Sequence, residues 1–216
     1  MALLARVVSQ VCGGRPTIVA ASGARLIMTT APDPSERRDL YTTIKKYLPD
    51  LIYGANDGIV TTLAIVSGVV GASLSTTVIL ILGFANLLAD GLSMGASNVL
   101  SRRSDTVADE LPSLCEASKH GAATFLGFVA VGIVPLSAYL VPWFDGHRFA
   151  AAVILGLLAL FVVGASRAAF TSRAWLPSGT EMLFIGALAA AAAYAIGAIG
   201  AMLVGVETSA SVASAN

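Results

Sequence analysis

Residues 51–71 read LIYGANDGIVTTLAIVSGVVG, a run of mostly apolar residues whose only charged side chain is Asp57. The hydrocarbon core of a bilayer is about 30 Å thick, and a helix of about 20 apolar residues crosses it. The stretch therefore predicts a membrane-spanning helix, with Asp57 inside the membrane.

Four further stretches have the same character, at 77–99, 121–141, 149–168 and 182–204. The whole chain is 56% hydrophobic and 12% charged, with a mean hydropathy of +0.81, whereas a soluble domain carries about 25% charged residues. We therefore expect an all-α integral membrane protein with five transmembrane helices. Its organisation is a disordered or cytosolic N-terminal extension (1–48), the five-helix transmembrane domain (49–206) and a disordered tail (207–216).

The N-terminal residues 1–32 contain three arginines and no acidic residue. Such a composition resembles a mitochondrial transit peptide. The other interpretation is an upstream extension, because Met28 precedes a polar stretch that makes a natural cytosolic start.

Lysine and arginine are distributed unevenly between the two ends of the expected spans. The side that holds the N-terminus has Arg37, Arg38, Lys45, Lys46, Arg102, Arg103, Lys119, Arg167 and Arg173, and the opposite side has Arg148. Positive residues favour the cytoplasmic side of a membrane. The N-terminus is therefore expected in the cytoplasm, and an odd number of spans places the C-terminus outside.

Two aspartates lie inside the first two spans. Asp57 is about 9 Å and Asp90 about 13 Å from the cytoplasmic ends of their helices, at 1.5 Å per residue. A charge within the membrane costs free energy and usually faces a partner or a water-filled path. Because the two helices are antiparallel, both carboxylates lie at similar depths and could share one cation.

Further polar residues continue this path along the second span. Asn86, Asp90, Ser93, Met94 and Ser97 fall within an arc of about 100° on one helical face. Carboxylate and amide oxygens suit hard divalent cations, and a thioether adds preference for softer transition metals. The candidate metal ligands are therefore Asp57, Asp90, Asn86 and Met94.

A structural explanation is open for each of these residues. Asp57 or Asp90 could pair with a cation such as Arg167, or be a carboxyl kept neutral by its apolar surroundings. Asn86 could bond a neighbouring helix, and a lone methionine in an apolar helix often only packs.

The segments DLIYGANDGIVTTLAIVSGVVGA (50–72) and ILGFANLLADGLSMGASN (81–98) strongly resemble the vacuolar iron transporter family. The likeness continues more loosely through FVAVGIVPL (128–136) and SGTEMLFIGALAA (178–190). The resemblance implies five spans and the export of ferrous iron or manganese from the cytosol. It also implies exchange of metal for protons, and a homodimer whose path lies between the two copies of the first and second spans.

The resemblance assigns roles to particular positions. The aspartate of the family's DG pair and the methionine of its S-M-G segment, which line the metal path, correspond to Asp57 and Met94. A glutamate of plant and fungal members falls at Asn86, and Asp90 stands one turn later at a position that is small in those members. Asp57 and Asp90 are the implied proton carriers.

The connection between the second and third spans departs from the family pattern. Plant members hold an extended metal-collecting domain there, whereas residues 100–120 are too few to build one. Asp105, Asp109, Glu110 and Glu116 are secondary candidates for cytoplasmic metal contacts, although we favour a solvated charged connector as the explanation for them. Short forms of this kind resemble bacterial members, which implies the bacterial plasma membrane; a eukaryotic host would imply a vacuolar or other organelle membrane.

The expected function is proton-coupled export of Fe²⁺ or Mn²⁺ by a homodimer in contact with membrane lipid. The alternative is a non-transporting scaffold or accessory subunit whose aspartates are structural. The sequence shows no nucleophile–base pair, HExxH motif or phosphate-binding loop, so we do not expect an enzyme. We expect neither a resident cofactor nor a nucleic-acid partner.

Overall fold

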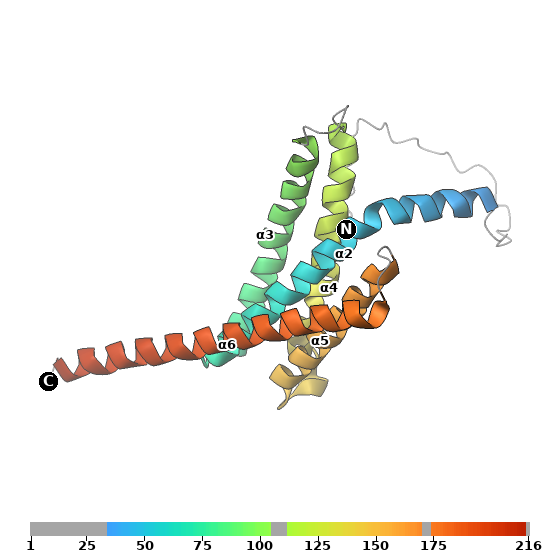
Figure 1. Ribbon diagram of the computed structural model, residues 1–216. Coiled ribbons are helices and arrows are strands. Elements are labelled where there is room, and N and C mark those ends of the chain that lie inside the picture. The colour runs from blue at the N-terminus through green and yellow to red at the C-terminus, as the bar shows by residue number, and fades with distance from the viewer. Residues whose placement is uncertain (1–33, 105–111, 170–173, 215–216) are drawn as a thin grey trace, which may run out of the picture.

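The structure, a computed structural model, describes residues 34–104, 112–169 and 174–214, with side chains over 45–104, 112–168 and 174–205. Within these residues there is no strand, and the long helices are α2 (Pro34–Gly71), α3 (Thr76–Arg103), α4 (Leu114–Leu140), α5 (Arg148–Ser166) and α6 (Trp175–Ser214) (Figure 1). Short 3₁₀ turns, Pro142–Phe144 and Arg167–Ala169, follow α4 and α5. Five helices are long and apolar enough to cross a membrane. The all-α, five-span prediction is therefore confirmed.

Pro49 and Pro177 lie inside helices, although the sequence predicts spans that begin after them, at residues 51 and 182. Pro49 is within α2, which starts at Pro34 and changes direction along its length (Figure 1), as helices do where a proline removes a backbone hydrogen bond. Pro177 is in the first turn of α6, where its missing N–H has no helical partner to lose. The last helix also continues to Ser214, past residue 206.

Close backbone contact between α2 and α4 forms the centre of the bundle. A Cβ atom added to Gly54 would lie 2.0 Å from the carbonyl oxygen of Thr124, and one added to Gly127 would lie 2.1 Å from that of Leu51. Small residues permit such contact in membranes, where association depends on packing rather than on a hydrophobic drive. Because α2 also contacts α3, α5 and α6, this contact positions the central helix.

The largest buried cluster lies where α2, α3, α4 and α5 meet. Phe128 of α4 is fully buried there, together with Val66 of α2, Leu87 of α3 and Ala152 of α5. The cluster therefore packs this part of α2 against three neighbouring helices.

Only a narrow stripe of α3 is buried. Its buried residues recur every fourth position, at Ile79, Gly83, Leu87, Gly91 and Gly95. On the opposite side Leu88 and Leu92 are 55% and 54% exposed. Helix α3 therefore lies at the edge of the bundle, with one face uncovered by the chain itself.

The α2–α4 contact predicts that Gly127→Ala is destabilising, because the added methyl group meets a backbone carbonyl that cannot move aside. Overpacking of this kind costs about 1–3 kcal/mol. The matched control is Gly200→Ala, since nothing lies within 4 Å of a Cβ at that position. Unfolding in detergent micelles should show a lower midpoint for Gly127→Ala and an equal or higher midpoint for Gly200→Ala; equal midpoints for both variants would contradict the packing described.

Candidate metal site

Asp57 of α2 and Asp90 of α3 lie on two helices that contact each other. Both residues are half-buried, and their carboxylates are close enough to interact electrostatically. Within the described residues neither carboxylate accepts a hydrogen bond or forms an ion pair, and neither is paired with Arg167. Two like charges at one place in a membrane call for a counter-charge, which a bound cation or protons can supply.

Two asparagines beside these aspartates have buried polar atoms without partners. They are Asn56 Oδ1, on the residue before Asp57, and Asn86 Nδ2, one turn before Asp90. Buried amide groups are normally hydrogen-bonded, and exceptions often mark an unfilled site. The oxygen and nitrogen of an asparagine amide can exchange places by a flip, so either asparagine can turn an oxygen toward a cation.

Met94 lies one turn after Asp90 on α3 and borders a hollow of about 330 Å³. Tyr53 of α2 and Ser97, Asn98 and Ser101 of α3 complete its lining. Hydroxyl and amide groups thus continue from the thioether toward the end of α3. The hollow reaches Met94, one turn from Asp90, and is lined by neither aspartate.

One chain does not enclose a complete metal site. No group of three or more His, Cys, Asp or Glu side chains converges in the part of the chain that the structure describes. The aspartate pair supplies two carboxylates, while neighbouring Ala89 and Ser93 on α3 are exposed. Further ligands would have to come from water or from another molecule placed against this face.

Glu116, the predicted cytoplasmic contact that the structure describes, forms its ion pairs away from the aspartate pair. Glu116 lies in the first turn of α4, where it forms ion pairs with Lys46 of α2 and, at 3.9 Å, with Lys119. Its carboxylate thus links α2 to α4. Asp105, Asp109 and Glu110 lie outside the described residues.

A second polar cluster, centred on Asp50, joins α2, α3 and α4. The Asp50 carboxylate accepts hydrogen bonds from Arg102 Nη2 at 2.9 Å and Asn98 Nδ2 at 2.8 Å, and its Oδ2 lies 2.5 Å from His120 Nδ1. Asn98 Nδ2 also donates to Thr124 Oγ1 at 2.6 Å. The Asp50 and His120 side chains are only 8% and 7% exposed. The Asp50 carboxylate therefore has its hydrogen-bond and ion-pair partners within the chain.

The sequence analysis missed this Asp50 cluster. Asp50 stands at the edge of the first apolar run, so it did not register as a charge within the membrane, and His120 appeared isolated. One signal was present: Asp50 precedes Asp57 by seven residues, two helical turns, and so lies on nearly the same face of α2. The four-residue spacing of Asn98 and Arg102, which share a hydrogen bond of 3.0 Å, was a second signal.

The Asp50 cluster predicts that Asp50→Ala is strongly destabilising, because it leaves Arg102, Asn98 and His120 without their shared acceptor. Removing one partner of a buried ion pair costs about 3–5 kcal/mol; since Arg102 is 39% exposed, we expect about 3 kcal/mol. Asp145→Ala is the control, because Asp145 pairs with Arg148 while 65% exposed and should cost less than about 1 kcal/mol. Unfolding curves in micelles measure both; a cost for Asp50→Ala no greater than that of the control would show that the cluster does not stabilise the fold.

Several known proteins are similar in sequence to this chain over most of its length. The profile of the VIT family matches residues 48–112 and 106–198. A vacuolar iron transporter of Plasmodium falciparum is 25% identical over 76% of this chain and 89% of its own length, and vacuolar iron transporter 1 of Arabidopsis thaliana is 23% identical over 71% and 86%. Vacuolar iron transporter homolog 2 of A. thaliana is 29% identical over 72% and 85%. The predicted resemblance is confirmed, and the chain belongs to the VIT family.

Proposed function

We propose that the chain transports a divalent transition metal, Fe²⁺ or Mn²⁺, out of the cytosol in exchange for protons. The observation that carries the proposal is the Asp57–Asp90 pair, two interacting carboxylates on adjacent helices with no hydrogen-bond or ion-pair partner among the described residues. The names of the relatives, vacuolar iron transporters, support a metal cargo. Met94, one turn from Asp90, supports a transition metal because a thioether favours softer cations.

The metal enters from the cytoplasmic end of α3 and follows the polar hollow beside Met94 to the aspartates. This direction uses the orientation that the lysine and arginine distribution predicts. On that orientation the Asp50 cluster lies at the cytoplasmic end of the path. It holds the ends of α2, α3 and α4 together while the aspartates deeper in the membrane stay available to the cargo.

Proton exchange follows because protons and the metal ion compete for the same carboxylate oxygens of Asp57 and Asp90. A carboxylate binds a metal only after losing its proton, so metal binding releases protons and protonation releases metal. Asp57 and Asp90 have no competing partner among the described side chains, and each can therefore alternate between proton and metal. A permanently paired carboxylate such as Asp50 is poorly suited to this role.

The working unit is a homodimer that joins the exposed faces of α3 and the adjoining part of α2. Asp90, Ser93 and Ser97 lie on or beside the uncovered face of α3. Polar groups facing lipid are costly, and a second copy would cover them. The same contact would bring a second aspartate pair to the path, supplying the ligands that one chain lacks.

A non-transporting scaffold is less well supported. It requires Asp57 and Asp90 to tie helices together, whereas among the described carboxylates Asp50 and Glu116 do so. The resident membrane is the plasma membrane in a bacterial host and a vacuolar membrane in a eukaryotic one.

Replacing either aspartate by asparagine should lower metal flux at least tenfold, because the amide keeps the size of the side chain but removes the charge that binds the cation. Uptake of Mn²⁺ and Fe²⁺ into proteoliposomes measures the effect. Asp145→Asn is the matched control, since this exposed aspartate lies in the α4–α5 connection. Undiminished flux in both Asp57→Asn and Asp90→Asn would overturn the proposal.

Metal uptake should also make the vesicle interior more alkaline, because each metal ion that enters is exchanged for protons that leave. A pH-sensitive dye inside the proteoliposomes records this change. Asp145→Asn should retain it, and Asp57→Asn should lose it together with uptake. Metal uptake without any internal pH change would refute proton exchange while leaving metal transport intact.

A further inference from the structure

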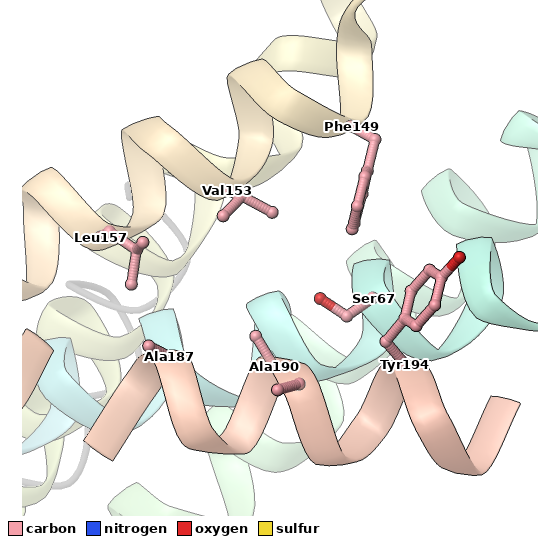
Figure 2. A pocket seen from close by; sticks show the side chains of 8 residues that line it. Ser67, Phe149, Val153, Leu157, Ala187, Ala190 and Tyr194 are labelled. Atoms are coloured by element: carbon pink, nitrogen blue, oxygen red, sulfur yellow. The ribbon is translucent and has the colours of Figure 1, made fainter. Parts of the chain in front are cut away.

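A groove of about 380 Å³ lies between α5 and α6 over the later part of α2, where Ser67 follows Asp57 by ten residues. Figure 2 shows Phe149, Val153 and Leu157 of α5 on one side, Ala187 and Ala190 of α6 on the other, and Ser67 of α2 at the base. Its volume falls in the range of sites that bind small molecules, about 300–1,000 Å³. Apart from Ser67 and the distant end of one tyrosine, the lining is hydrocarbon.

The groove exists because α6 is held close to its neighbours at two separate places. Near its start, a Cβ on Gly179 would lie 2.8 Å from the Phe161 ring of α5; farther along, a Cβ on Gly197 would lie 2.1 Å from the Gly68 carbonyl oxygen of α2. Between these contacts α6 lines the groove with Ala187 and Ala190, beside Gly186, where a Cβ would lie 2.0 Å from Leu160 of α5. Close contacts of α6 with α5 and α2 therefore fix the groove, and the short alanine side chains leave its space open.

Ser67 gives the groove one specific polar group. Its side chain is 1% exposed, its Oγ has no hydrogen-bond partner, and it points into the space between α5 and α6 (Figure 2). An unpaired buried hydroxyl costs free energy. A ligand in the groove that carries an acceptor oxygen next to Ser67 would remove this cost.

The surroundings of the groove identify the class of ligand. Ile154 and Leu158 of α5 and Leu188 of α6, which flank it, are 58%, 57% and 62% exposed, as side chains that face lipid are. The membrane-crossing part of α2, Lys45–Gly71, has 27 residues and is about 40 Å long, about 10 Å more than the hydrocarbon core. Ser67, about 6 Å from its end, thus lies near the boundary at which lipid ester groups are found.

We propose that this groove binds one acyl chain of a membrane glycerolipid, whose ester carbonyl accepts a hydrogen bond from the Ser67 hydroxyl. The chain lies along Phe149, Val153 and Leu157 and fills the space that the alanines of α6 leave open. The bound lipid packs between α6 and α5 over α2. It therefore stabilises the fold and takes no part in the metal path.

The test compares two phosphatidylcholines of equal chain length, one with ester linkages and one with ether linkages that lack the carbonyl. Native mass spectrometry of the full-length, delipidated protein in metal-free buffer measures binding of each. The diester should bind about threefold to tenfold more tightly, the effect of one hydrogen bond. Ser67→Ala should abolish the difference, and Ala190→Leu should weaken both lipids about tenfold by filling the groove.

Ala192→Leu is the matched control, because Ala192 is exposed on α6 and does not line the groove; it should bind as the unmodified protein does. Equal binding of diester and diether lipid, or undiminished binding to Ala190→Leu, would overturn the proposal. A photoreactive group at Val153 that labels a second protein copy instead of lipid would also overturn it. Ser67→Ala adds no bulk, so its result stands even if Ala190→Leu fails to fold. Because no metal is present, these outcomes are independent of transport.

Discussion

Close contact between the backbones of α2 and α4 is the constraint on which the rest of the structure depends. Gly54, Gly58 and Gly127 let the two helices approach until side chains no longer separate them. In a bilayer, where lipid tails are as apolar as leucine, such contact supplies much of the packing energy. It fixes α2 in the middle of the bundle, and α3 packs beside both α2 and α4.

This geometry gives two aspartates on one helix different roles. Asp50 meets His120 of α4 and Arg102 of α3, and its charge is satisfied by hydrogen bonds within the chain. Asp57, two turns deeper, interacts among the described charged side chains with another carboxylate, that of Asp90. A charge within a membrane needs a partner. The first aspartate therefore belongs to the architecture, and the second is available to a mobile cation.

The sequence was sufficient for the number and type of helices, because apolar runs of the required length leave few alternatives. From helical rise and antiparallel direction it also predicts similar depths for Asp57 and Asp90, whose carboxylates are close enough in the structure to interact electrostatically. It did not reveal the Asp50 cluster, which depends on how α4 docks on α2 and brings His120 from 70 residues away. The α5–α6 groove was equally hidden, since alanine-rich helices pack closely or splay according to where glycine contacts occur.

Locating a bound ion would test the central claim, that Asp57 and Asp90 hold the transported metal. Crystals of the protein grown with Mn²⁺ would give an anomalous-difference map in which the ion scatters above all lighter atoms. The account predicts a peak within coordination distance of both carboxylates, about 2.0–2.3 Å from their oxygens, on the α3 side of α2. A peak at the Asp50–His120 cluster, with none between Asp57 and Asp90, would contradict it.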